Sequence, residues 1–116
     1  VSAPFHCALM EPAAVGLGCY LAGVGFQAPV LPVFTSVEAR LVTGAAEVPG
    51  LLVRQVTAPV RWEETVRALG ATGATVAFET GPGRVLTGLL RRIAPELTGV
   101  PVGDLEGVAR VAEVLG

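Results

Sequence analysis

His6 is the only histidine in the 116-residue chain, and histidine is the side chain best suited to move a proton near neutral pH. It lies where an irregular opening segment gives way to an apolar, helix-like stretch, so a helix N-terminus and loop backbone can orient its imidazole. This position predicts a general acid–base role. A partly buried histidine that is held by hydrogen bonds and does no chemistry fits the same spacing, and composition does not separate the two interpretations.

No side chain in the sequence is placed to act as an activated nucleophile beside this histidine. Ser2 and Ser36 are the only serines, and neither lies in a Gly-Xaa-Ser-Xaa-Gly setting. Cys7 follows His6 directly, but sequence neighbours point to different sides of a helix, so we expect an inert, buried thiol. Cys7 and Cys19 form no paired framework, which favours a reduced, cytoplasmic compartment.

The turn Gly81-Pro82-Gly83-Arg84 could bind a phosphate group through free backbone N–H groups, because it follows a strand-like run and precedes a helix-like one. It is not a P-loop, since it lacks the spacing and the Lys-Ser/Thr pair of that motif. A tight strand-to-helix turn without a ligand explains the same residues and is the favoured interpretation.

Hydrophobic spacing predicts the elements that must position these residues. In the N-terminal half, apolar residues at three- and four-residue intervals predict a helix over Ala8 to Val24. Two extended segments, Val30 to Phe34 and Glu38 to Val42, should follow it. A helix over Glu47 to Val56, after a break at Pro49-Gly50, completes this half.

The C-terminal half alternates helix-like and strand-like segments. We expect a helix over Arg61 to Leu69, a buried central strand within Thr75 to Thr80, a helix over Arg84 to Ile93, a short strand over Val100 to Val102, and a helix over Leu105 to Leu115 capped by Asp104. This alternation predicts an α/β layered fold with a largely parallel sheet.

The composition predicts one globular domain at most. With 52% apolar residues, a mean hydropathy of +0.64 and 16% charged residues, the chain is too apolar for a free-standing domain of its size, so it should pack against more protein. The start at Val1, with no Met and no leader, looks like a cut.

A net charge of −2 argues against nucleic-acid and anionic-membrane partners, and no apolar run reaches the roughly 18 to 20 residues of a membrane helix.

Four stretches carry a resemblance to a known family: VSAPFHCALM (residues 1 to 10), PVFTSV (32 to 37), LVRQVTAPVRW (52 to 62) and ETGPGRVLTGLLRR (79 to 92). In this order they resemble the acyltransferase family that contains the malonyl-CoA:acyl carrier protein transacylases and the acyltransferase domains of fatty-acid and polyketide synthases. The histidine motif and the GPG motif at this separation are a specific signal. The last two dozen residues carry no such motif.

The resemblance implies a ping-pong transfer of a malonyl group from malonyl-CoA to the phosphopantetheine thiol of acyl carrier protein in fatty-acid synthesis, with no cofactor and no metal. A serine on a Gly-His-Ser-Xaa-Gly elbow attacks the thioester, and the carrier thiol then attacks the acyl-serine. His6 would be the general base in both halves. The motif places the backbone carbonyl that holds this histidine on Gln55, where a Ser-His-Asp triad has an acid.

The resemblance also defines which part of the enzyme the chain would be. It implies that residues 1–116 are the C-terminal segment of the large α/β subdomain, a three-layer hydrolase-like fold. The serine elbow, the oxyanion-hole segment, the carboxylate-binding arginine and a small ferredoxin-like subdomain belong to the N-terminal portion of the same enzyme. That portion would be a partner of this segment, and the segment alone should be inactive.

Phe5 gains a substrate-selecting role from the resemblance. It matches the position that separates malonyl selection (HAFH) from methylmalonyl selection (YASH) in polyketide acyltransferases, because a ring there fills the space of an α-methyl branch. Ala3-Pro4 departs from both patterns, and a plain packing phenylalanine is the alternative.

Arg91 and Arg92 are the only adjacent basic pair, with Arg84 about two helical turns earlier. Because acyl carrier proteins are acidic and this chain is slightly acidic itself, docking needs such a local basic patch. An ordinary solvated helix end, where cations complement the helix dipole, is the alternative.

Two other functions fit the sequence. One is a free-standing α/β module that binds a phosphate-bearing ligand at its GPG turn without catalysis, and the other is a degenerate scaffold subunit. A serine elbow upstream in the full-length gene would favour the transacylase, whereas a start codon at Val1 would favour the binding module.

Overall fold

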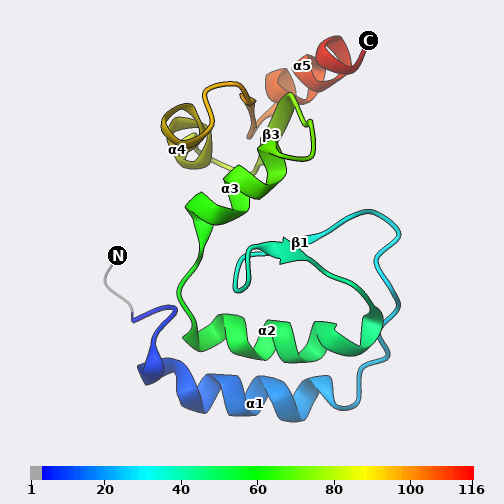
Figure 1. The fold of residues 1–116 in the computed structure, drawn as a ribbon, viewed down its shortest axis with the longest axis vertical. Helices are drawn as coiled ribbons and strands as arrows, with labels where there is room; N and C mark the ends of the chain where they lie inside the picture. Colours follow the sequence, from blue (N-terminus) through cyan, green and yellow to red (C-terminus); the bar gives the residue numbers. More distant parts are fainter. Residues whose placement is uncertain (1–3) are drawn as a thin grey trace. The chain divides into compact units, whose positions relative to one another are not determined.

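The computed structural model describes residues 4–116 and divides into two compact units, of which the first ends at Thr65 and the second begins at Val66 (Figure 1). The first unit contains a 3₁₀ turn (Ala8–Met10), helix α1 (Glu11–Leu21), strands β1 (Phe34–Thr35) and β2 (Arg40–Leu41), a second 3₁₀ turn (Ala45–Glu47) and helix α2 (Val48–Thr57). Helix α3 (Trp62–Gly70) spans the boundary. The second unit contains β3 (Val76–Thr80), α4 (Val85–Ile93), β4 (Thr98–Val102) and α5 (Leu105–Leu115).

Helices α1 and α2 lie side by side in the first unit, as Figure 1 shows in blue and green. Small residues of α1 allow this approach: Ala14 is buried, and a Cβ added to Gly18 would lie 3.7 Å from Cγ2 of Val53. Leu51 of α2 is buried as well. The pairing brings the 3₁₀ turn that precedes α1 against α2, which is how the segment around His6 reaches that helix.

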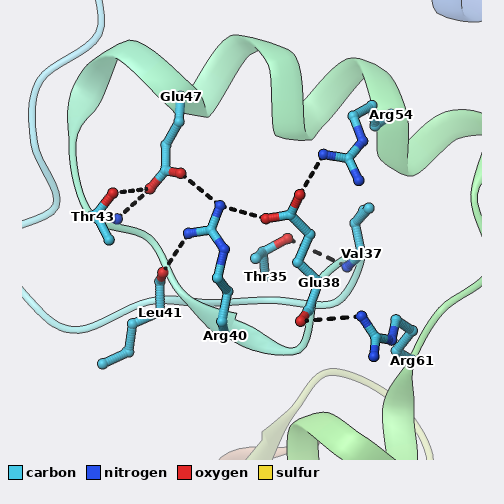
Figure 2. A network of polar contacts seen from close by, with 9 residues as sticks. All are labelled: Thr35, Val37, Glu38, Arg40, Leu41, Thr43, Glu47, Arg54 and Arg61. Carbon is cyan, nitrogen blue, oxygen red and sulfur yellow. Dashed lines mark hydrogen bonds and ion pairs between the residues drawn. The ribbon is translucent and has the colours of Figure 1, made fainter.

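Strands β1 and β2 form an antiparallel hairpin that ionic contacts tie to α2 (Figure 2). The carboxylate of Glu38 binds both Arg40 and Arg54, and Arg40 also binds Glu47 at 2.8 Å. The hydrogen bond from Arg54 lowers the pKa of Glu38, and the one from Arg40 is the main cause that lowers the pKa of Glu47 to about 2. Arg61 donates to the Glu38 carbonyl at 3.3 Å, so the segment after α2 is held to the same hairpin.

The second unit is built on the parallel pair β3 and β4, in which Phe78 lies opposite Val100. Helix α4 connects the two strands and packs on β4, which α5 also contacts. A Cβ on Gly99 would lie 2.9 Å from Cγ2 of Thr87, so glycine is required for α4 to pack this closely on β4. Leu90 and Leu97 are buried with Val100 and form the core of this unit.

The structure confirms an α/β fold with parallel strands and corrects three details of the prediction. Val30 and Leu31 lie in a loop, with Val30 99% exposed, so the extended segment is the two-residue β1 and not Val30 to Phe34. Pro49 lies in the first turn of α2, where its missing N–H is harmless, so it begins the helix and does not precede it as a break. The predicted central strand, β3, is half-buried, because β4 is its only neighbour within residues 4–116.

The remaining helix predictions are confirmed within a few residues. The expected N-terminal helix is a 3₁₀ turn followed by α1 and ends at Leu21. Asp104 caps α5 as predicted, by accepting a 2.8 Å hydrogen bond from the backbone N–H of Gly107. No helix of the described part of the chain is long and apolar enough to span a bilayer.

Candidate active site

His6 lies in a turn with a left-handed backbone, at φ = 54°. This conformation costs an L-residue roughly 1–2 kcal/mol, and such strain concentrates at functional positions. The thiol of Cys7 donates to the carbonyl of Pro4 at 3.2 Å and so closes the turn around His6. Cys7 is half-buried, which is less than the full burial expected of it.

The imidazole of His6 contacts the end of α2. Its Nδ1 lies 2.7 Å from the backbone carbonyl oxygen of Gln55, the contact that the family resemblance implies. A carbonyl oxygen only accepts, so Nδ1 must carry the hydrogen of this bond. In the neutral ring Nε2 is then the unprotonated nitrogen, free to accept a proton.

The carbonyl of Gln55 is available because of where α2 ends. Gln55 lies in the last turn of α2. Carbonyl groups in the last turn of a helix have no helical N–H four residues later to bind. The residue four positions later is Pro59, which has no N–H. The backbone at Ala58 is extended, as expected before proline, and its own N–H bonds to Arg54 at 2.9 Å. The proline therefore ends the helix and leaves the Gln55 oxygen for His6.

A pocket of about 370 Å³ surrounds the imidazole. It is lined by Phe5, His6, Met10, Leu17, Leu52, Gln55 and Val56. None of these side chains is an acid or an arginine, so nothing charged in the lining substitutes for the Gln55 carbonyl. A second pocket of about 480 Å³ shares Leu52 and Gln55 with the first and extends under the β1–β2 hairpin.

The structure thus brings Phe5, His6 and Gln55 together in one pocket. Sequence reasoning missed its apolar wall. The signal for that wall was present, because Leu52 and Val56 lie four apart on one face of α2 and Met10 and Leu17 lie seven apart.

No serine lines this pocket within residues 4–116. Ser2 lies outside the described residues, and Ser36 lines the neighbouring pocket, with its carbonyl accepting from the backbone N–H of Arg61 at 2.9 Å. The described residues also hold no group of three or more His, Cys, Asp or Glu side chains that could bind a metal ion.

Comparison with known proteins decides the family. The malonyl CoA-acyl carrier protein transacylase of Haemophilus influenzae is 41% identical over 115 residues, which are 99% of this chain and 37% of that protein. The solved acyl-carrier-protein-S-malonyltransferase of Bartonella henselae matches with a TM-score of 0.92 at 42% identity, over 100% of this chain and 37% of that one. The chain belongs to the malonyl CoA-acyl carrier protein transacylase family. No family model matches it.

The chain spans only part of the length of the proteins it matches, about 37% in both comparisons above, and corresponds to their C-terminal part. A third match is a structure of a type II polyketide-synthase acyl carrier protein in complex with its malonyl-transacylase, with a TM-score of 0.91 and 42% identity over 98% of this chain and 37% of that one.

The GPG turn of this chain is a tight strand-to-helix connection. Gly81 and Gly83 have φ values of 122° and 106°, which favour glycine. The carboxylate of Glu79 accepts from the backbone N–H groups of Leu86 (3.0 Å) and Thr87 (2.7 Å) and from the Thr87 hydroxyl (2.6 Å). The Thr87 hydroxyl is the main cause that lowers the pKa of Glu79. Because this carboxylate already binds amides at the start of α4, a phosphate-binding role for the turn is not favoured.

The two arginines predicted to act as a pair have different surroundings in the structure. Arg91 and Arg92 are both exposed in the last turn of α4. Arg91 lines a pocket of about 390 Å³ together with Arg84 and Arg110, whereas Arg92 does not.

Proposed function

We propose that this chain is the histidine-bearing part of an enzyme that transfers a malonyl group from malonyl-CoA to the phosphopantetheine thiol of acyl carrier protein. The observation that carries the proposal is the 2.7 Å contact between Nδ1 of His6 and the carbonyl of Gln55 in an apolar pocket. It fixes the tautomer in which Nε2 accepts a proton. Membership in the transacylase family supplies the reaction in which such a base is needed.

In the first half of the proposed reaction His6 activates a serine that lies outside this chain. Nε2 takes the serine proton as the serine oxygen attacks the thioester carbonyl of malonyl-CoA. The carbon–sulfur bond then breaks, and the coenzyme A thiol leaves with the proton that His6 returns. The Gln55 carbonyl steadies the imidazolium between these steps, as the acid does in a Ser-His-Asp triad.

In the second half His6 activates the carrier protein. Nε2 takes the proton of the phosphopantetheine thiol, and the sulfur attacks the acyl-serine ester. The carbon–oxygen bond breaks, and the serine oxygen recovers the proton from His6. No cofactor or metal is needed, because the malonyl thioester is already activated.

Exposed apolar residues support the proposal that the N-terminal portion of the same enzyme covers this segment. Leu9, just before α1, is 75% exposed, and Val15 and Tyr20 within α1 are 58% and 74% exposed. Such surface is unusual for an isolated domain.

We place the segment in the large subdomain of a three-layer hydrolase-like fold, active only when the serine-bearing portion is present. The free thiols of Cys7 and Cys19 suit a reducing, cytoplasmic compartment.

In the proposal Phe5 selects the acyl group and the end of α4 binds the carrier protein. Phe5 lines the His6 pocket while 60% exposed, so its ring can restrict the space beside the acyl group. Arg91 and Arg92 give α4 two adjacent cations at its end, a patch that suits an acidic carrier protein. The known complex of a relative with its carrier protein supports this class of partner.

Substitution of His6 in the complete enzyme tests the proposal. His6→Asn is preferable to alanine, because asparagine tolerates the left-handed backbone. We expect malonyl transfer to fall by roughly 10²-fold or more at neutral pH, the usual contribution of a positioned general base. The matched control is Gln55→Ala, which keeps the backbone carbonyl and should retain most activity. Near-normal turnover of His6→Asn would refute the proposed role.

A further inference from the structure

Arginines of the first unit form ion pairs with carboxylates, whereas two arginines of the second unit do not. In the first unit Arg40, Arg54 and Arg61 each bind a carboxylate: Arg40 and Arg54 bind Glu38, and Arg61 binds Glu64. The side chains of Arg84 and Arg91, at the start and end of α4, make no hydrogen bond or ion pair within residues 4–116. In a chain with a net charge of −2, this uncompensated positive charge needs an explanation.

Arg84 and Arg91 line one pocket, together with a third arginine from another helix. The pocket of about 390 Å³ is lined by Arg84 at the N-cap of α4, Arg91 of α4 and Arg110 of α5, together with residues of β4. Arg84 and Arg110 also line an adjoining pocket of about 240 Å³. Arg84 is the N-cap residue just before α4 and Arg91 lies in the last turn of that helix, and both line this pocket.

Among residues 4–116, the carboxylate that forms an ion pair with this cluster is Glu106, which accepts from Nη2 of Arg110 at 3.0 Å. The Nε of Arg110 is buried without a hydrogen-bond partner in the described structure, so this guanidinium is not satisfied internally. Asp104, which caps α5, lines the adjoining pocket with Arg84 and Arg110, so the three arginines face two carboxylates, Glu106 and Asp104. The pocket therefore retains a positive excess.

We propose that Arg84, Arg91 and Arg110 form a binding site for the phosphate group of a small organic phosphate. Guanidinium groups bind phosphate oxygens in a bidentate manner, and several of them together favour an anion with more than one charge. Val100, Pro101 and Val114 supply an apolar wall for the organic part of the ligand, and the volume lies in the range of small-molecule pockets. The donors are side chains of α4 and α5 and not the amides of the GPG turn, and the site does not depend on the proposed transfer reaction.

Calorimetric titration of the protein with inorganic pyrophosphate at low ionic strength tests the site. We expect saturable binding that Arg84→Gln, Arg91→Gln and Arg110→Gln each weaken by about tenfold, the size of one charge-assisted hydrogen bond. Arg92→Gln is the matched control, since it removes the same charge from the same turn of α4 but lies outside the pocket, and it should change the Kd by less than about twofold. Adenosine 3′,5′-bisphosphate should bind at least as tightly as pyrophosphate, because it can also contact the apolar wall.

Three results would overturn the proposal. The first is a lack of saturable pyrophosphate binding in the millimolar range. The second is equal weakening by Arg91→Gln and Arg92→Gln, which would indicate a diffuse positive patch or an acidic protein partner on the end of α4. The third is binding of malonate as tight as that of pyrophosphate, which would indicate a carboxylate site. All four arginine side chains are largely or partly exposed, so circular dichroism should show unchanged folding in every variant.

Discussion

Pro59 leaves the carbonyl of Gln55 without a backbone donor, and the imidazole of His6 takes the vacant position at 2.7 Å. Replacing Pro59 by alanine would supply an N–H four residues after Gln55 and allow α2 to compete for this oxygen. Losing one hydrogen bond costs roughly 1 kcal/mol, so we expect about a fivefold loss of transfer rate in the complete enzyme.

The tautomer of His6 gives a more direct measurement of the same effect. Because the chain has one histidine, its two ring nitrogens give an unambiguous ¹⁵N signal. We expect the Nδ1–H form to dominate in the native chain and to decrease in Pro59→Ala. Pro49→Ala is the control, since Pro49 lies in the first turn of α2, where no N–H is used. An unchanged tautomer ratio in Pro59→Ala would show that the proline does not position His6.

Phe5→Ala should relax substrate selection in the complete enzyme. The ring lines the His6 pocket, and removing it makes room for an α-methyl branch. One methyl group is worth roughly 10-fold or more in selectivity, so the ratio of malonyl to methylmalonyl kcat/KM should fall by about this factor. If both values fall together with no change in their ratio, Phe5 only packs the site.

Acidification should weaken the first unit through Glu47. Arg40 and Thr43 lower its pKa to about 2 in the folded chain, so its stabilising contribution is complete above the ordinary pKa of 4.5 and is lost as the pH falls toward 2. Glu47→Gln should therefore lower the urea midpoint at pH 7 and flatten its pH dependence below pH 4.5. Glu11→Gln, at an exposed carboxylate without a hydrogen bond in the described structure, is the matched control.

Glu79→Gln should loosen the start of α4 in the second unit. The carboxylate holds two backbone N–H groups and the Thr87 hydroxyl, and a neutral amide holds them less well. We expect the Tm to fall by about 4 °C, as for the loss of a helix cap in a domain of this size. Glu113→Gln on α5 serves as the control. An equal Tm for both variants would mean that the Glu79 contacts do not hold α4.

The double variant Arg91→Glu/Arg92→Glu tests carrier docking, and because Arg91 also lines the phosphate site, Arg110→Gln is needed to separate the two roles. In the complete enzyme it should raise the KM for acyl carrier protein, leave malonyl loading of the serine intact and flatten the salt dependence. An unchanged KM and salt response would mean that the carrier binds elsewhere. Arg110→Gln should leave the carrier KM unchanged, because it lies outside the adjacent pair.

Local patterns predicted the helices well because their caps and spacings are encoded nearby. Asp104 before α5 is an example, since its side chain binds an N–H only three residues on. The strand predicted at Val30 to Phe34 was wrong, because an apolar run alone does not provide a pairing partner, and the hairpin register depends on Phe34 meeting Leu41.

The functional residues likewise fall into a part that the sequence predicted and a part that it did not. Motif resemblance indicated Phe5, His6 and Gln55, and the structure brings them into one pocket. The arginine pocket could not be predicted, because Arg110 reaches it from α5, a helix without a recognised motif. The arginine pocket forms only because α4 and α5 both pack closely on β4, and the spacing of residues in the sequence does not predict that packing.

The left-handed backbone of His6 means that the proposed base reduces the stability of the fold at its own position. A glycine there would adopt φ = 54° without strain, so His6→Gly should relieve the turn while it removes the proposed base. A selection for thermal robustness alone would then discard the proposed base. Directed evolution of this protein should therefore screen for activity alongside heat resistance, or hold position 6 fixed.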